Sequence, residues 1–194
     1  MISAIFAFGN FIYGYFALPE SLSKDLRRPF SWKSANPVSA IINLRKHPVI
    51  STLAVSLTLI YLASHAVQST WSYYTMYKFG WDEKHVGISL GVVGGLIMLV
   101  QGIIIRWTIK KWGATRSIVL GLIFYIVGLL LFGLANAGWM MYFFAIVYCM
   151  GGIAGPNLQG LMSNKTAPNK QGELQGALSG LMSITAIFGP LMML

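Results

Sequence analysis

The strongest constraint on this chain is a long stretch without charge. Residues 117–164 contain no Asp, Glu, Lys or Arg. In a water-soluble fold a stretch of this length would place charged side chains on its exposed surface, so the solvent here is lipid or other protein. The sequence therefore predicts an all-α, polytopic bundle of membrane-spanning helices, with the lipid bilayer as its first partner.

The composition supports the same class and argues against others. Apolar residues make up 56% of the chain and charged residues 10%, whereas soluble domains carry about 25% charged residues. The net charge of +9 is typical of nucleic-acid binders, but the basic residues sit in short segments between apolar runs, so we expect no nucleic acid as partner. Since the sequence has no HExxH, no Cys/His metal set and no P-loop, we expect no enzyme, metal site or cofactor.

Six segments are apolar over nearly the length of about 20 residues that a bilayer-spanning helix needs. They lie at 1–18, 48–77, 84–106, 116–135, from the turn at 136–138 to 164, and 172–194. We expect a transmembrane helix (1–18), a loop (19–47) and a five-helix bundle (48–194). The first and last spans have no polar flanks beyond them, and we therefore expect a fragment of a longer protein.

The basic residues predict the orientation. All but two of the 14 Lys and Arg lie in the segments 19–47, 106–116 and 165–170, which alternate along the chain and so share one side of the membrane. Lys78 and Lys84 are the exceptions. Because cytoplasmic loops are rich in Lys and Arg, the loop 19–47 is predicted to be cytoplasmic, in a multi-pass protein of the cell's inner membrane. Within it, residues 38–46 fit either a short amphipathic helix on the cytoplasmic leaflet or a plain linker.

The second span carries a polar stripe at helical spacing, made by Ser64, His65, Gln68, Ser72 and Thr75. Polar side chains in a membrane face a cavity or another helix. The stripe therefore either lines a substrate cavity or bonds neighbouring helices, and aromatic residues beside it suit a planar ligand. The candidate cavity residues are His65, Gln68, Trp71, Tyr74, Gln101 and Asn157.

The sixth span is rich in small residues. Gly172, Gly176 and Gly180 lie four apart, a spacing that lets two helices approach closely, and Gly189-Pro190 is expected to kink the helix. We therefore predict a helix-packing role for these five residues. No acidic residue lies inside any span. Proton-driven transport usually needs an embedded carboxylate, so if the chain belongs to a proton-coupled transporter, that group must lie in sequence outside this chain.

Five stretches resemble the major facilitator superfamily, and specifically the tetracycline-resistance branch of its drug:proton antiporters. They are 171–181 with Gly189-Pro190 (helix eleven), 151–159 (helix ten), 79–90 (the junction of helices seven and eight), 18–37 (the central cytoplasmic loop) and 106–116 (a short basic loop motif). By this resemblance 1–18 is helix six and 48–194 holds helices seven to eleven, so helices one to five and the twelfth are missing. The acidic residue that helix nine of tetracycline pumps often carries has no counterpart in 117–135.

The resemblance implies efflux of lipophilic drug-like compounds, such as tetracycline-type antibiotics, by proton antiport, with the proton gradient as energy source. It implies a missing N-terminal bundle as partner and a cytoplasmic gating loop that contains Arg106, Gly113 and Arg116. Two alternatives stay open: a solute-importing facilitator of the same superfamily, and a half-length subunit that is inactive alone.

Overall fold

The structure, a computed structural model, describes residues 2–17, 37–44 and 47–193, and every regular element among them is a helix. This confirms the predicted all-α class. The α-helices are α1 (Ile2–Ala17), α2 (Pro37–Leu44), α3 (Pro48–Phe79), α4 (Glu83–Leu99), α5 (Ile105–Leu134), α6 (Gly138–Met150), α7 (Ala154–Asn164) and α8 (Gln171–Leu191). A π-helical segment, Val100–Ile104, joins α4 to α5, and 3₁₀ segments, Gly151–Ile153 and Pro168–Lys170, precede α7 and α8.

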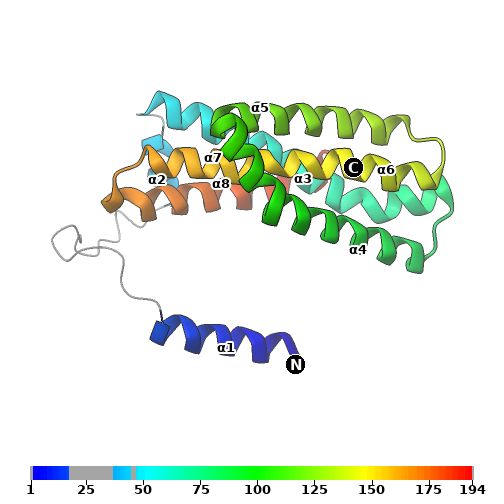
Figure 1. The fold of residues 1–194 in the computed structure, drawn as a ribbon, viewed down its shortest axis with the longest axis horizontal. Coiled ribbons are helices and arrows are strands. Elements are labelled where there is room, and N and C mark those ends of the chain that lie inside the picture. Colours follow the sequence, from blue (N-terminus) through cyan, green and yellow to red (C-terminus); the bar gives the residue numbers. More distant parts are fainter. Residues whose placement is uncertain (1, 18–36, 45–46, 194) are drawn as a thin grey trace.

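Four helical stretches are long and apolar enough to cross a membrane: Pro48–Phe79, Glu83–Leu134, Gly138–Asn164 and Pro168–Leu191. The second has 52 residues, about 78 Å of helix, which is more than twice the roughly 30 Å of a hydrocarbon core. It reverses at Gly113, where φ is 78° and ψ is 166°, a conformation that side-chain-bearing residues rarely adopt. The chain therefore crosses twice here, as Figure 1 shows for α4 and α5, and the two arms correspond to the expected spans 84–106 and 116–135.

Local sequence signals set the helix ends. Pro48 occupies the first turn of α3, where a missing N–H costs nothing, and Gly80 closes that helix in the left-handed conformation with φ at 65°. Asp82 caps α4 by accepting a hydrogen bond of 2.8 Å from the backbone N–H of His85. This backbone hydrogen bond and, to a smaller extent, the hydrogen bond from the His85 ring lower the pKa of Asp82. The cap is therefore retained until the pH falls through that lowered pKa.

In the bundle from α3 onward, consecutive spans alternate in direction, so that α3 and α8 run parallel to each other and α5 runs antiparallel to α6 and α7. Helix α3 packs along α8, and α5 packs along α6 and α7, while α7 also contacts α3 and α6 contacts α4. Helix α2 and the α7–α8 connection lie at one end of the bundle in Figure 1, and the α3–α4 and α5–α6 connections lie at the other. The basic segment 165–170 therefore lies at the opposite end from Lys78 and Lys84, in agreement with the orientation predicted from charge.

Close helix packing depends on glycines in α5. A Cβ on Gly128 would lie 2.6 Å from the Cα of Tyr148 on α6, and a Cβ on Gly121 would lie 2.8 Å from the backbone N of Ala154 on α7. Because lipid tails are as apolar as leucine, van der Waals contact rather than the hydrophobic effect holds such helices together. These two glycines, seven residues apart, therefore set how closely α5 approaches its neighbours.

The two N-terminal helices differ in their surroundings. Helix α1 lies apart from the bundle in both views, and its aromatic residues, including Phe6 and Phe16, are exposed. Helix α2 instead packs on α8, and its Asn43 donates a hydrogen bond of 2.9 Å to Glu173 in the first turn of α8. Of the two interpretations left open for residues 38–46, the structure shows a helix, over Pro37–Leu44, and residues 45–46 lie outside the described residues.

Candidate functional site

The polar stripe of α3 divides into exposed and buried positions. Gln68 is exposed on the helix surface, and His65 is half-buried beside it. Trp71 is only 8% exposed: its Nε1 donates to the Ser89 hydroxyl of α4 at 2.9 Å, and its ring packs edge-on against Phe132. Trp71 thus bonds the neighbouring helix α4, whereas the side chain of Gln68 is exposed.

Tyr74 lies beside the far end of the same stripe. Its hydroxyl donates to the backbone carbonyl of Phe132 on α5 at 2.9 Å and accepts a hydrogen bond from Lys78. The Lys78 ammonium also lies 5.1 Å from the centre of the Tyr74 ring, within the range of a cation–π contact. These contacts tie the end of α3 to α5, so Tyr74 sits at a helix–helix junction.

His65 lies next to a polar contact, between Tyr61 and Gln159, that the sequence prediction missed. Its ring lies stacked near that of Tyr61, one turn earlier in α3, with centroids 6.4 Å apart. The Tyr61 hydroxyl accepts a hydrogen bond of 2.8 Å from Nε2 of Gln159 on α7. Two features of the sequence indicate this contact. Tyr61 is four residues before His65 and so lies on the same face of the helix, and Gln159 is a polar residue inside a span, three residues after Pro156.

The other two cavity candidates lie at irregular points of their helices. Gln101 is exposed in the π-helical segment Val100–Ile104, and such segments often occur at functional sites. Asn157 is 4% exposed, and its side-chain amide donates to the carbonyl of Ile153 at 2.8 Å. It thereby satisfies the carbonyl of the last residue of the 3₁₀ segment. None of the six candidates is hydrogen-bonded to another among the described residues.

A second polar face runs along α8, on the side away from the core. Gln175, Ser179 and Ser183 are exposed at a spacing of four residues, next to exposed Gly172 and Gly176. A Cβ on either of these two glycines would meet nothing within 4 Å, so the described chain supplies no neighbour for them. Polar side chains exposed within a span face water or protein in preference to lipid.

The end of α8 is a tight crossing. A Cβ on Gly189 would lie 2.7 Å from the Cβ of His65 and 3.1 Å from the backbone N of Ala66 on α3. Pro190 follows inside the helix, and Gly180 is half-buried. The structure thus brings Gly189 against α3.

The predicted gating loop lies at the reversal at Gly113, within the element α5. Arg106 and Arg116 are exposed on either side of Gly113, and the Ser117 hydroxyl donates to the Gly113 carbonyl at 2.8 Å. Close by, the Lys111 ammonium lies 4.8 Å from the centre of the Trp107 ring. The turn therefore presents several cations around one glycine with positive φ.

These features define a polytopic membrane bundle with polar faces on α3 and α8. Among the described residues, no group of three His, Cys, Asp or Glu is placed to hold a metal. The family model described as "Major Facilitator Superfamily" matches residues 1–190. The chain belongs to the major facilitator superfamily and is a multi-pass protein of the inner membrane.

The relatives include bacterial resistance proteins. The chain is 32% identical to "Tetracycline resistance protein, class C" of Escherichia coli, covering 94% of this chain and 46% of that protein. It is 30% identical to the class D protein of Salmonella ordonez, over 99% of this chain and 48% of that protein. It is also 26% identical to "Hippocampus abundant transcript 1 protein" of Homo sapiens, over 90% of this chain and 36% of that protein. The chain thus spans about half the length of the resistance proteins it resembles.

Proposed function

We propose that this chain forms the C-terminal bundle of a transporter that exports lipophilic drug-like compounds in exchange for protons. The similarity to tetracycline resistance proteins along almost the whole chain carries this proposal. The compounds include tetracycline-type antibiotics, because those are what the names of these relatives specify. The importing facilitator, the alternative left open by the sequence, has no specific observation in its favour.

The polar faces of α3 and α8 supply one wall of the transport cavity. These helices are packed side by side, and they expose Gln68 on one and Gln175 and Ser179 on the other. Amide and hydroxyl groups of this kind orient a ligand through a few hydrogen bonds while apolar neighbours bind its rings. Gln68 is the strongest of the predicted cavity residues because its side chain is exposed within a span.

The partner of this bundle is a second, N-terminal bundle of the same transporter. Helix α4 exposes Gly87, Gly91 and Gly94, and a Cβ on any of these would meet nothing within 4 Å. Gly172 and Gly176 of α8 are equally open. Glycine-lined faces allow helix backbones to approach closely, so both faces suit contact with a second bundle across a cavity between them.

Proton coupling in this proposal depends on the second bundle. The acidic residues of the chain are Glu20, Asp25, Asp82, Glu83 and Glu173, and all lie outside the span interiors. An embedded carboxylate that binds and releases the proton must therefore come from the other half. The reversal at Gly113, with Arg106 and Arg116, supplies the cytoplasmic gate, which opens and closes as one bundle rocks against the other.

A resistance assay tests the proposal. The complete protein that contains this chain is expressed in a bacterial strain without its own drug pumps, beside residues 1–194 alone at matched abundance. We expect the complete protein to raise the inhibitory concentration of tetracycline or another lipophilic drug severalfold, and the half-length chain to leave it unchanged. Unchanged inhibitory concentrations with the complete protein across a broad drug panel would refute export. Resistance from residues 1–194 alone would refute the need for a second bundle.

A further inference from the structure

Two neighbouring spans lose their regular α-helical geometry at the same level of the bundle. The stretch Gly138–Asn164 changes to a 3₁₀-helix at Gly151–Ile153, with the 13 residues of α6 before it and the 11 residues of α7 after it. The π-helical segment Val100–Ile104 interrupts the neighbouring span, before the chain reverses at Gly113. The two irregular segments contact each other, so both interruptions lie side by side in the interior of the bundle.

The contact between the two segments is a small buried cluster. Val100 is 3% exposed and Ile153 is fully buried, and both pack with Ile105. A Cβ on Gly152 would lie 3.8 Å from Cγ1 of Val100, an ordinary van der Waals distance. The backbone at Gly152 thus faces the side chain of Val100 directly, and the two segments share one interface.

The backbone hydrogen bonds of both segments are irregular. Ala154 donates its N–H to the carbonyl three residues earlier, and Ile105 donates its N–H to the carbonyl five residues earlier. Pro156 has no N–H to donate to the carbonyl of Gly152, four residues before it. Helices bend at proline, at glycine and at π-helical turns, and a 3₁₀ stretch within a helix often marks a hinge. Both spans therefore have a physical reason to bend at this level.

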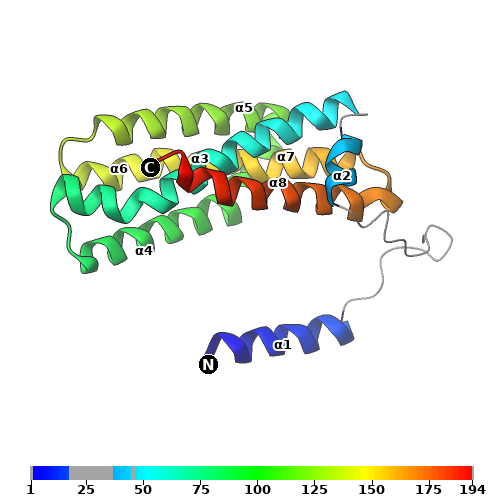
Figure 2. The same cartoon turned by 180° about the vertical axis from the view of Figure 1, so that it is seen from behind.

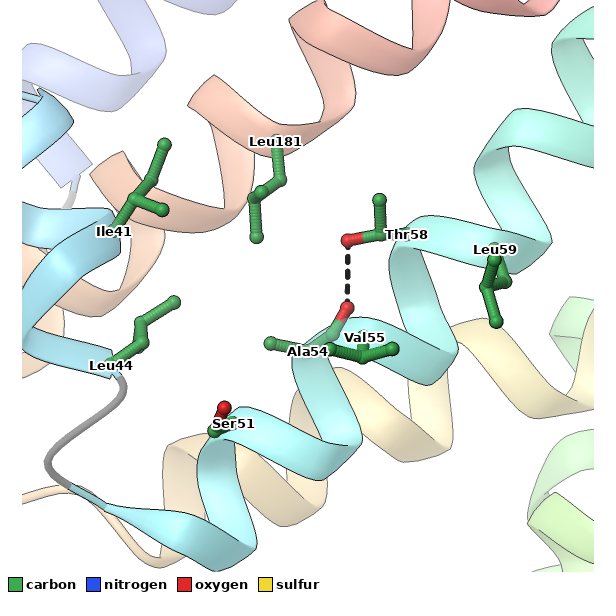
Figure 3. A pocket seen from close by; sticks show the side chains of 8 residues that line it. All are labelled: Ile41, Leu44, Ser51, Ala54, Val55, Thr58, Leu59 and Leu181. Atoms are coloured by element: carbon green, nitrogen blue, oxygen red, sulfur yellow. Dashed lines mark hydrogen bonds between the residues drawn. The ribbon is translucent and has the colours of Figure 1, made fainter.

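The buried core also divides at this level. The outer core, on the side away from the cytoplasm, joins α3, α4, α5 and α6 and includes Trp71 and Met141. The cytoplasmic core joins α3, α5, α7 and α8 and includes Met162. Figure 3 shows its edge, where Ala54 of α3 and Leu181 of α8 lie beside α2 and border a pocket of about 240 Å³. The small cluster between the two irregular segments belongs to neither core, so each half of the bundle packs around its own centre.

We propose that the two irregular segments act as one joint, at which the outer halves of these two spans bend together relative to their cytoplasmic halves. Because Val100 packs on Ile153, a bend in one span displaces the backbone of the other. His65 and Gln68 lie in α3 between the parts of that helix that belong to the two cores. In the export function proposed above, on which this last step rests, bending at the joint reshapes the cavity wall while one bundle rocks against the other.

Backbone hydrogen exchange in the complete protein, purified in detergent, tests the joint without any drug. Mass spectrometry follows the peptides that cover the two segments. Gly152→Ala and Gly102→Ala stiffen the 3₁₀ and π-helical segments, because alanine favours a regular helix over glycine. Gly160→Ala and Gly95→Ala are the matched controls in the same two spans, outside the joint. At all four positions the new methyl group would meet no atom of the described chain closer than 3.8 Å.

The decisive measurement is exchange in the span that was not substituted. The gain in helix propensity makes local opening about fivefold rarer, so exchange in the substituted segment should slow by about that factor. For Gly152→Ala and Gly102→Ala, exchange in the partner segment should also slow, by about twofold or more, whereas the controls leave the partner segment unchanged. Slowing confined to the substituted span would overturn the joint as a single unit. So would wild-type exchange as slow in both segments as in the middle of α5, because a joint must open more often than a regular helix.

Transport measurements separate the joint from the proposed function. In the complete transporter, Gly152→Ala should lower drug turnover severalfold at an unchanged Kd for the drug, and Gly160→Ala should keep the wild-type turnover. Wild-type turnover in Gly152→Ala, with exchange slowed in both segments, would overturn the role of the joint in transport. A wild type that exports no drug would refute the proposed function, and the exchange measurements would then decide on the joint by themselves.

Discussion

Replacing Gly128 by alanine should loosen the bundle, whereas the same change at Gly133 should not. Both glycines lie in α5, so both substitutions gain helix propensity, up to about 1 kcal/mol in a helix interior. At Gly128 the new methyl group would lie 2.6 Å from the Cα of Tyr148, roughly 1 Å closer than carbon atoms prefer. At Gly133 it would meet nothing within 4 Å.

The obstacle at Gly128 is backbone, so no side-chain rotation relieves it and α5 and α6 must separate. Overpacking of this kind costs about 1–3 kcal/mol. Gly128→Ala should therefore unfold with a free energy at least about 1 kcal/mol below that of Gly133→Ala. Reversible unfolding in mixed micelles, followed by circular dichroism, measures this difference. Equal stabilities for the two variants would refute the claim that glycine sets the approach of α5 to α6.

The remaining predictions concern the site and the topology. In the complete transporter, Gln68→Leu should alter the drug profile at normal abundance, and an unchanged profile would remove Gln68 from the cavity wall. His65→Leu should leave the pH dependence of transport nearly unchanged, and Trp71→Phe, which removes the hydrogen-bond donor to Ser89, should mainly lower the free energy of unfolding, by about 0.6 kcal/mol. Cysteines at exposed Lys165 and Asn136 should be labelled by an impermeant reagent from opposite sides of the membrane, and labelling from one side only would reject the topology. Gly113→Ala should slow transport and lower the free energy of unfolding by about 1–3 kcal/mol, because φ of 78° with ψ of 166° is a conformation essentially limited to glycine; wild-type stability would argue against a glycine-dependent turn.

The sequence predicted the class and order of the helices because lipid imposes a simple rule. Long apolar segments must be helical to satisfy their backbone groups, and residues such as Pro48 and Gly80 mark helix ends by their own conformational limits. The reversal between the third and fourth spans was equally visible, since a continuous helix there would be far longer than a bilayer is thick.

Contacts between helices were less predictable. Trp71 lies beside the polar stripe that contains Gln68, yet Trp71 is buried against Ser89 of α4 and Gln68 is exposed, because the position of α4 decides which side chains are covered. Likewise the glycine pattern of α8 did not reveal that Gly189 meets α3 while Gly172 meets nothing in the described chain. The bond between Gln159 and Tyr61 joins residues 98 positions apart, and periodicity within one helix carries no information on such a pairing.

Drug transport into everted membrane vesicles tests the central proposal most directly. Vesicles that contain the complete transporter are energised to an acidic interior, and the uptake of a fluorescent lipophilic drug is followed with and without a protonophore. Proton-coupled export predicts drug accumulation inside the vesicles that collapses when the protonophore removes the pH gradient, and that is absent from vesicles containing residues 1–194 alone. Uptake that persists unchanged after the gradient is removed, or no uptake by the complete transporter, would contradict the proposed function.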